Sequence, residues 1–374
     1  MKYRVVSIVG ARPQFIKLAP IYRAFKRYNF INHIILHTGQ HYDYLMSDVF
    51  FKIFGIEKPD INLSVGSAEH HIQTAEMIKG IGEGIKRIKP HLILIYGDTN
   101  STLAGAIAAS KQGIPIAHIE SGLRSYIRSM PEEINRVVAD RLSDLLFCPS
   151  ENAIQNLREE GFSNIISSAN SFKSSSPPYL IKCGDLMFDI LKTVRDSIKN
   201  PNLSLSPSGD YLLATIHRAE NTDNLKRLKG IFSALNTIGK EIEVILPLHP
   251  RTRNILERNN LINKYQNIRI IEPLSYIDML HYEMNSKMIL TDSGGVQKEA
   301  FWLLKPCITL REKTEWVETV KYGFNIVAGT DKESIIRAYN RHKESFKPDK
   351  RRLNIYGDGN AANKIVGYII DYLR

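Results

Sequence analysis

The sequence predicts an α/β protein with two domains, each a parallel β-sheet flanked by helices. Short β-branched apolar runs alternate with amphipathic stretches from one end of the chain to the other, which is the pattern of successive β-α-β units. At 374 residues the chain is also too long for one core of ordinary size. Two Rossmann-like domains of similar size are therefore expected.

The first series of elements occupies residues 1–180. Its expected strands are Arg4–Val9, His33–His37, Leu92–Tyr96, Ile114–Ile119 and Leu145–Cys148. Its expected helices are Phe15–Tyr28, Tyr42–Ile53, Ile72–Ile88, Ser101–Lys111 and Glu132–Leu142. The runs and their spacing predict a first Rossmann-like domain.

The second series occupies residues 181–360. Its expected strands are Tyr211–Ile216, Glu243–Leu246, Ile268–Ile271, Met288–Thr291 and Cys307–Leu310. The Ser- and Pro-rich segments 167–178 and 200–209 are interpreted as loops, the first of them an exposed insertion. Residues 361–374 have a helical pattern and are expected to pack back on the first domain.

The composition indicates which class of ligand the protein binds and in which compartment it works. The formal net charge of +11 is spread along the chain without an aromatic-interleaved basic motif, so we expect a small anionic ligand and no nucleic acid. No apolar run approaches the roughly 18 residues that span a bilayer, and membrane insertion is not expected. Cys148, Cys183 and Cys307 are far apart and show no metal-ligand spacing, which favours a cytoplasmic protein without disulfides.

Polar motifs follow the expected strands of the first half. The first strand runs into GARPQFIK (10–17), where Arg12 and Lys17 lie near a helix start whose amides favour an anion. No GxGxxG occurs there, so the usual mode of NAD binding is not predicted. The motifs GDTNST and HIESGLRS place Asp98 and Glu120 at the ends of two strands expected to be neighbours. Carboxyl ends of parallel strands are where open sheets bind ligands.

The motif PEEINR (131–136) adds charged residues at the start of a helix. Glu132 is a candidate acid–base group and Arg136 a candidate ligand-binding cation. Glu133 is explained equally well by a role in the site and by the favourable interaction of its charge with the helix dipole.

The second half repeats this arrangement. The motif TIHRAEN (215–221) places His217 after a strand, and LHPR (248–251) does the same for His249. In TDSGGVQKEA (291–300) the small residues Ser293–Gly295 open a helix, which suits close backbone approach to a diphosphate. Glu299, one turn further on, could reach ribose hydroxyls.

Together these motifs resemble the non-hydrolysing UDP-N-acetylglucosamine 2-epimerase family, in the expected order from about Val5 to Gly329. The resemblance implies a GT-B-like arrangement of the two Rossmann-like domains, an active site in the interdomain cleft, a homodimer, and neither cofactor nor metal. It implies nucleotide-binding roles for Arg12, His217, Ser293, Gly294, Gly295 and Glu299. It implies catalytic or sugar-proximal roles for Asp98, Glu120, Glu132 and His217. We add Lys17, Arg136 and His249 as candidate substrate-binding residues.

The implied reaction is inversion at C2 of a UDP-linked 2-acetamido sugar, of the UDP-GlcNAc to UDP-ManNAc type, for surface polysaccharide precursors. The hydrogen on C2 is not acidic, so the family eliminates UDP to form a 2-acetamidoglycal and then adds UDP back. Such chemistry needs acid–base groups on both faces of the ring and stabilisation of the diphosphate. Which carboxylate removes the proton stays open.

Departures from the family pattern leave the substrate open. Ser121 replaces the alanine of HVEAGLRS, and Ala219 replaces the second arginine of HRRE. GARPQFIK and GDLMFD (184–189) look more like the branch acting on UDP-2,3-diacetamido-2,3-dideoxyglucuronate than like the commoner enzymes with GTRPE and GN. That branch, a hydrolysing epimerase and a GT-B glycosyltransferase are the alternatives.

A regulatory second nucleotide-sugar site, which the resemblance implies for many bacterial relatives, is expected to be lost. Those relatives have QHREMLDQ after the second strand, whereas this chain has QHYDYLMS, with Ser47 in place of the second glutamine. No arginine occurs between Arg27 and Arg87, and Ala219 lacks a guanidinium. Each lost charge-assisted hydrogen bond is worth about 1.5–3 kcal/mol.

We therefore predict that initial velocity rises hyperbolically with substrate, and that the mannose-configured epimer reacts without added UDP-GlcNAc. An effector shifts a conformational equilibrium only through differential affinity for the two states, which the weakened site no longer supplies. Initial rates in both directions check this. A sigmoidal curve, or strict dependence of the reverse reaction on UDP-GlcNAc, would contradict it.

Overall fold

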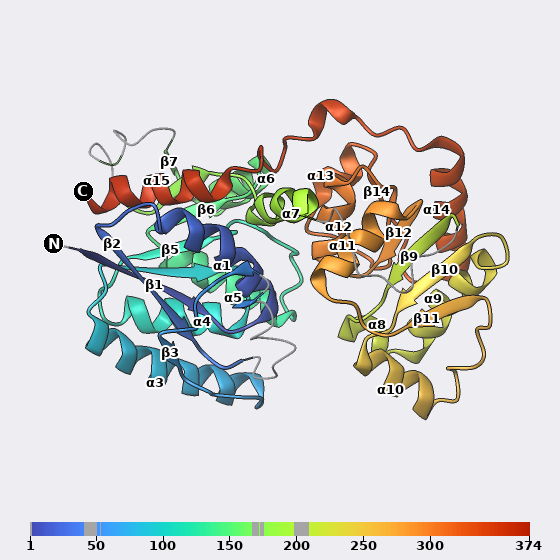
Figure 1. Cartoon of the computed structure of the whole chain (residues 1–374), viewed down its shortest axis with the longest axis horizontal. Coiled ribbons are helices and arrows are strands. Elements are labelled where there is room, and N and C mark those ends of the chain that lie inside the picture. Colours follow the sequence, from blue (N-terminus) through green and yellow to red (C-terminus); the bar gives the residue numbers. More distant parts are fainter. Residues whose placement is uncertain (1, 41–50, 53, 167–171, 173–175, 198–208) are drawn as a thin grey trace. The chain divides into compact units, whose positions relative to one another are not determined.

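The computed structural model describes residues 2–40, 51–52, 54–166, 172, 176–197 and 209–374 (Figure 1). The expected helix Tyr42–Ile53 lies largely outside the described residues, as do most of the predicted loops 167–178 and 200–209, and His41 and Ser47. The chain divides into two compact units. Unit 1 comprises Met1–Ile190 and Ile355–Arg374, and unit 2 comprises Leu191–Asn354.

Unit 1 contains an eight-stranded sheet in which every pairing is parallel. The strand order is β3-β2-β1-β4-β5-β6-β8-β7. The strands are β1 (Tyr3–Val9), β2 (Ile31–His37), β3 (Ile61–Asn62), β4 (Leu92–Tyr96), β5 (Ile116–Ile119), β6 (Leu145–Cys148), β7 (Asn164–Ile165) and β8 (Tyr179–Lys182). The order reverses between β1 and β4, which makes that pair the switch point where doubly wound sheets bind ligands.

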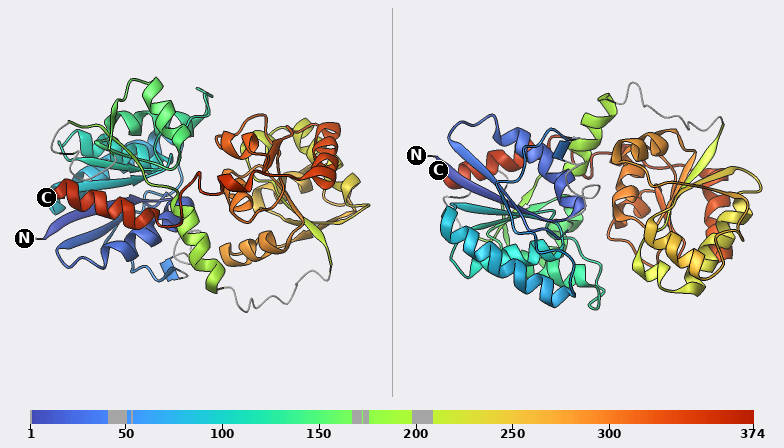
Figure 2. Two further views of the ribbon diagram at one scale, coloured as in Figure 1. Left: turned by 90° about the horizontal axis from the view of Figure 1, so that it is seen from above. Right: turned by 60° about the horizontal axis from the view of Figure 1, so that its bottom comes forward.

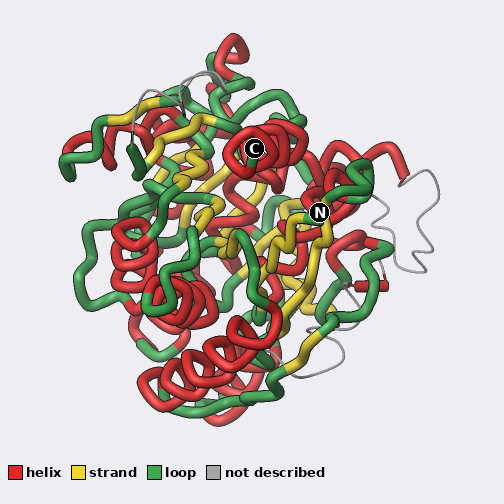
Figure 3. Tube along the Cα trace, turned by 90° about the vertical axis from the view of Figure 1, so that its left-hand side faces the viewer, coloured by secondary structure: helices red, strands yellow, loops and turns green. Residues whose placement is uncertain are grey.

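Helices cover both faces of this sheet (Figure 3). The helices are α1 (Arg12–Phe25), α3 (His70–Ile88), α4 (Asn100–Ser110), α5 (Pro131–Leu142), α6 (Glu151–Glu159) and α15 (Ala361–Leu373), and α7 (Leu186–Ser197) begins in unit 1 and continues into unit 2. One buried cluster joins apolar residues of β1, β4 and β5 to α3, α4 and α5. Helix α4 lies close to the strands because Gly105 has no side chain: an added Cβ would come within 2.9 Å of Ile95 and 3.0 Å of Ile8.

Unit 2 repeats the design with six parallel strands in the order β11-β10-β9-β12-β13-β14. The strands are β9 (Tyr211–Thr215), β10 (Glu243–Pro247), β11 (Ile268–Ile271), β12 (Met288–Thr291), β13 (Cys307–Thr309) and β14 (Asn325–Val327). The helices are α8 (Ala219–Thr222), α9 (Leu225–Ile238), α10 (Pro250–Arg258), α11 (Tyr276–Asn285), α12 (Gly294–Trp302), α13 (Val317–Lys321), α14 (Lys332–Ser345) and the 3-10 helix Lys350–Arg352. The switch point here lies between β9 and β12.

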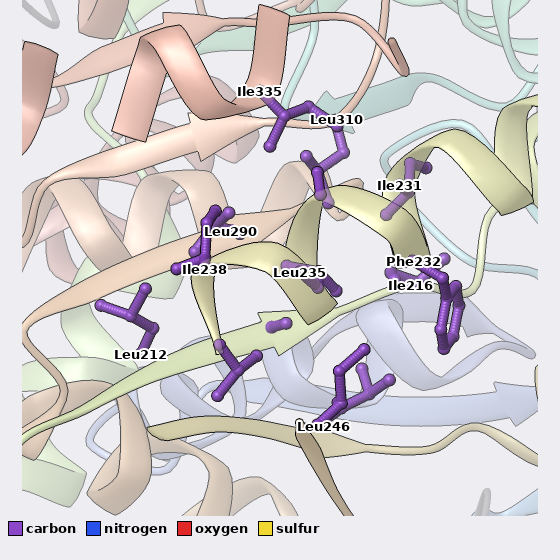
Figure 4. Close-up of a cluster of buried hydrophobic side chains, with 14 of the residues drawn as sticks. Leu212, Ile216, Ile231, Phe232, Leu235, Ile238, Leu246, Leu290, Leu310 and Ile335 are labelled. Carbon is purple, nitrogen blue, oxygen red and sulfur yellow. The ribbon is translucent and has the colours of Figure 1, made fainter. Parts of the chain in front are cut away.

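Alternate residues of β9 enter two different cores. Leu212 and Ala214 pack in a cluster that includes α9, α10 and α14, and Figure 4 shows ten labelled members of it. Tyr211 and Leu213 point the other way, into a cluster with residues of α11 and α12. A strand buried on both faces is expected where helices cover both sides of a parallel sheet.

The ten strands expected from the sequence are all present, with ends that differ by two residues or fewer. Helix α1 begins three residues earlier than expected, at Arg12, because Pro13 is well tolerated in a first helical turn. The strands β3, β7, β8 and β14 were not expected. In β3, β7 and β14 two or three residues are too few for a clear hydrophobic pattern, and the four residues of β8 directly follow the Ser- and Pro-rich segment interpreted as a loop.

The C-terminal helix α15 belongs to unit 1, where it packs on α1 (Figure 2). Asp189 of α7 accepts hydrogen bonds from the backbone amides of Ala361 and Ala362 at 3.0 and 2.8 Å. One carboxylate therefore caps the start of α15 and joins it to α7.

The sign of the Asp189 pKa shift gives a stability prediction. Burial raises the pKa of Asp189 from 3.8 to about 6, even though the two amides favour the ionised form. This group's contribution to stability is thus complete below pH 3.8 and is lost, by up to about 3 kcal/mol, as pH rises through 6. Relative to Asp189→Asn, the wild-type melting temperature should fall between pH 4 and pH 7. A constant or rising difference would contradict the prediction.

Candidate active site

Gln14 joins the two loops that flank the switch point of unit 1. Its Oε1 accepts hydrogen bonds from the amides of Gly10 and Ala11, after β1, at 2.8 and 3.1 Å. Its Nε2 donates to the Tyr96 carbonyl oxygen, at the end of β4, and to Thr102 Oγ1, both at 3.0 Å. The sequence motif GARPQFIK contains this residue, but its side chain stabilises the loops and is buried away from solvent.

Gly10 allows the loops to meet. A Cβ built there would lie 1.9 Å from Thr38 Oγ1 and 2.3 Å from Ser101 Oγ. These two hydroxyls are 2.8 Å apart, and Ser101 also donates to Gln40 Oε1 at 2.7 Å. The ends of β1 and β2 and the start of α4 therefore form one polar cluster.

Asp98 lies directly after this cluster and is paired with a cation. Its Oδ2 accepts from Arg136 Nη2 of α5 at 2.5 Å, and the Asp98 side chain is 35% exposed. Arg136 is almost fully buried and also lies 3.2 Å from Glu133 Oε2. The sequence thus correctly placed Asp98 at a strand end, and the structure brings Arg136 to it.

Glu133 proves to stabilise a loop. Its carboxylate accepts hydrogen bonds from the amides of Ser125 and Tyr126 and from the Ser125 hydroxyl, each at 2.9 Å. The loop after β5 is fixed on α5 by this carboxylate.

Glu120 is paired with Lys17, whose ammonium group contacts Glu120 Oε2. Glu120 has a left-handed backbone, with φ of 68°. Its amide and that of Ser121 both donate to the Phe147 carbonyl oxygen at 3.1 Å. Two amides on one carbonyl make a local bulge at the end of β5, and such bulges redirect a side chain.

A small cavity adjoins this ion pair. Its lining includes Lys17 and Glu120 together with Pro149, Gly184, Asp185 and Leu186, all of unit 1. Since β4 and β5 are paired neighbours, Asp98 and Glu120 follow adjacent strands, as the sequence predicted. Arg12 is exposed at the first position of α1, and Glu132 is partly exposed at the second position of α5.

Asp292 has the corresponding joining role at the switch point of unit 2. It is fully buried at the end of β12. Its carboxylate accepts from the amides of His217 and Arg218 at 3.0–3.1 Å, and from Asn221 Nδ2 at 3.1 Å. The His217 ring lies with Nδ1 3.4 Å from Asp292 Oδ1 and keeps 38% of its side chain exposed. Asp292 therefore fixes both the backbone and the ring of His217.

The start of α12 directly follows Asp292. Ser293 is its N-cap, with Oγ accepting from the Val296 amide at 3.5 Å, and Gly294 and Gly295 form the first turn. An added Cβ on Gly294 would be 3.2 Å from Trp316 Nε1. A helix start with small residues and a neighbouring histidine favours an anion.

The other candidates of unit 2 occupy different environments. His249 caps α10, with Nδ1 accepting from the Arg251 amide at 3.2 Å, and its ring centroid lies 6.0 Å from that of His217. Glu299 is 4% exposed, within α12. His217, His249 and Ser293 therefore follow the neighbouring strands β9, β10 and β12 at the same edge of the sheet, whereas the Glu299 side chain is buried inside the unit.

Two groups in unit 2 were missed from the sequence. Arg311, after β13, is almost fully buried between Glu315, at 3.0 Å, and Glu220, at 2.8 Å. Burial opposes the charged form, but these carboxylates outweigh it and raise the pKa of Arg311. Lys298 is also buried, with Nζ 4.0 Å from the Trp316 ring centroid. Glu315 is only four residues from Arg311, but Glu220 and Trp316 come from other parts of the chain, so no local motif pointed to either group.

Comparison with known proteins agrees with this architecture. A family model described as UDP-N-acetylglucosamine 2-epimerase matches residues 23–370. A UDP-N-acetylglucosamine 2-epimerase homolog of Methanococcus maripaludis is 46% identical over 372 residues, covering 97% of this chain and 98% of that protein. A UDP-2,3-diacetamido-2,3-dideoxy-D-glucuronate 2-epimerase of Pseudomonas aeruginosa is 44% identical over 367 residues, covering 98% and 99%.

A solved structure is similar over nearly the whole chain. The crystal structure of Methanocaldococcus jannaschii UDP-GlcNAc 2-epimerase in complex with UDP-GlcNAc and UDP matches with a TM-score of 0.86 and 40% identity, covering 98% of this chain and 99% of that one. The two doubly wound sheets thus define an α/β protein of the Rossmann-like class predicted from the sequence, whose solved neighbours are GT-B-like. Within that class, the chain belongs to the UDP-N-acetylglucosamine 2-epimerase family.

Among the helices that the structure describes, none is long and apolar enough to cross a bilayer. Within the described part of the chain, no group of three or more His, Cys, Asp or Glu side chains is arranged to hold a metal ion. Independence from metals and cofactors stays a prediction.

The buried carboxylate of Asp292 gives a stability prediction. Asp292→Asn leaves a single acceptor oxygen for donors that now share two, and bonds to charged groups are worth about 1.5–3 kcal/mol each. We expect the free energy of unfolding to fall by about 2–4 kcal/mol, measured by denaturant titration. The control is Asp331→Asn, because Asp331 accepts from the Ser334 amide at 3.0 Å at an exposed helix start of the same unit. An equal loss in both variants would contradict a special role for Asp292.

Proposed function

We propose that this epimerase inverts C2 of a UDP-linked 2-acetamido sugar by eliminating UDP and adding it back. In the forward half, a base takes the C2 proton while the C1–O bond breaks and UDP leaves with the electron pair. The 2-acetamidoglycal then accepts a proton at C2 on the opposite face, and UDP oxygen re-forms the bond to C1. Atoms and charges balance without any other reactant.

Unit 1 would supply the acid–base groups. Asp98 and Glu120 follow adjacent strands, and each contacts a cation, Arg136 and Lys17 respectively. A carboxylate positioned by a cation can take a proton from carbon, and in its protonated form it can donate a proton back. Glu132, at the start of the helix that carries Arg136, is the third candidate.

Unit 2 would hold the leaving diphosphate. The backbone amides that begin α12 at Ser293–Gly295 directly follow Asp292, whose carboxylate accepts from the His217 amide and lies 3.4 Å from the His217 ring. Preorganised donors stabilise charge that develops on a leaving oxygen without having to reorient. Arg12 of unit 1 and His249 of unit 2 are the further candidates for binding the diphosphate, and Glu299 is the candidate for binding the ribose hydroxyls.

The single observation that carries the proposal is the pair of carboxylate–cation contacts after the neighbouring strands β4 and β5 of unit 1. Two acid–base candidates on neighbouring strands match a reaction that must move a proton to and from one carbon. The sequence family supplies the reaction class, and this geometry supplies residues able to perform it.

A diacetamido-glucuronate substrate is the second candidate, on one specific observation. Gly184 and Asp185, from the motif that resembles that branch, line the cavity beside Lys17 and Glu120. A sequence difference that marks the branch therefore lies next to Glu120, one of the proposed acid–base groups, and its partner Lys17. The relative of Pseudomonas aeruginosa, named for that substrate, is 44% identical.

We further propose a homodimer that works in the cytoplasm. The three cysteines are free and buried, which suits a reducing compartment. Burial raises the pKa of the Cys148 thiol to about 12, so that thiol has little tendency to react. Light scattering of the purified protein tests the oligomeric state.

The deciding experiment is proton NMR of the purified protein with each UDP sugar in D2O. Inversion at C2 with deuterium incorporated there, and UDP retained in the product at equilibrium, is expected. Release of free sugar and UDP would indicate a hydrolysing epimerase. Turnover only with an added acceptor would indicate a glycosyltransferase, and retention on nucleic acid that falls steeply with salt would indicate a nucleic-acid-binding protein.

We predict that Asp98→Asn, Glu120→Gln and Glu132→Gln each lower turnover by about two to four orders of magnitude, the usual contribution of a general acid or base. Initial rates measure this. Glu151→Gln is the matched control, because Glu151 pairs with Lys182 at 3.0 Å on the surface of the same unit. Near-wild-type turnover in all three variants would refute the assignment.

A further inference from the structure

A fully buried ion and hydrogen-bond network lies beneath the two acid–base candidates of unit 1. His118, on β5, and Asp140, on α5, are both 0% exposed. His118 Nδ1 lies 2.7 Å from Asp140 Oδ1, and its Nε2 lies 2.7 Å from the Gly97 carbonyl oxygen. Because both partners are acceptors, the ring donates in both directions.

Asp140 also holds the loop that follows Glu120. Its Oδ2 accepts from the Gly122 amide at 3.1 Å and from Arg124 Nη1 at 2.7 Å. Arg124 in turn binds Glu160 at 2.5 and 2.9 Å. Burial opposes ionisation of Asp140, but His118 and Arg124 outweigh it and hold the pKa of that carboxyl below its usual value.

These contacts flank both candidate carboxylates. Glu120 stands between His118 and Gly122, and both of these bind Asp140. Asp98 directly follows Gly97, whose carbonyl oxygen is held by His118. The left-handed backbone at Glu120, with φ of 68°, is unfavourable for a residue other than glycine and makes this position dependent on such fixing.

We propose that Asp140, acting through His118, is the positioning residue that sets the distance between Asp98 and Glu120. The inference rests on the proposed function. A buried ion pair is weak support for stability alone, since apolar residues of similar volume often stabilise as well. A network that ends on the backbone next to both candidate carboxylates, at the Gly97 carbonyl oxygen and the Gly122 amide, has a second use, because misplacement of a reacting group by about 1 Å can cost roughly a hundredfold in rate.

The test is Asp140→Asn, with Asp144→Asn as matched control. Asp144 Oδ2 accepts from the Ile116 amide at 2.8 Å, at the opposite end of the same strand β5. We expect kcat to fall about 10- to 100-fold in Asp140→Asn with little change in KM or in UDP affinity, and to change less than about threefold in Asp144→Asn. Combined with Glu120→Gln, the effect of Asp140→Asn should shrink several-fold, because it acts partly through Glu120.

A second readout does not need turnover. Backbone hydrogen exchange over residues 118–124 should be faster in Asp140→Asn than in Asp144→Asn. His118→Gln, which keeps an amide donor, replaces Asp140→Asn if that variant does not fold. Equal turnover and equal exchange in the two Asp variants would overturn the inference. A wild-type protein that inverts no UDP-2-acetamido sugar would instead refute the proposed function, while the exchange result still decides whether Asp140 fixes the loop.

Discussion

The loops that leave each sheet at its switch point must have their backbone amides hydrogen-bonded, and the candidate site depends on how this is done. In a doubly wound sheet, neighbouring chains diverge at this point, so no adjacent strand can satisfy those groups. Buried side chains take that role here. Gln14 does so at the switch point of unit 1 and Asp292 at that of unit 2, and Asp140 does the same for the loop after β5.

The two units use this device for different chemistry. In unit 1 the fixed loops carry carboxylates, and each of these contacts a cation from a helix, Lys17 of α1 or Arg136 of α5. In unit 2 the fixed loops present backbone amides of α12 and the His217 ring. Similar topology thus presents carboxylates in one unit and hydrogen-bond donors in the other, because different residue types follow equivalent strands; in the proposed function the first transfer protons and the second bind the diphosphate.

Burying these polar groups costs free energy that apolar side chains would not. Charged groups such as Asp140, Arg124 and Arg311 lose solvation when buried, and each stays ionised because partners of opposite charge outweigh that loss. The position of these buried charged groups beside the strand ends is explained if they hold the residues of the candidate site accurately in place. The apolar clusters on both faces of the sheets supply the stability that the polar edges do not.

The sequence by itself determined the α/β class, the ten main strands and the position of Asp98, Glu120, His217 and Ser293 at strand ends, since these follow from local periodicity and from which residue comes next along the chain. It could not determine side-chain partners. Arg136 with Asp98, Lys17 with Glu120, and Asp140 with His118 join residues 22 to 103 positions apart. Only tertiary structure decided them, because a parallel sheet and its crossover helices bring distant strand ends and helix faces together, and no local pattern encodes that meeting.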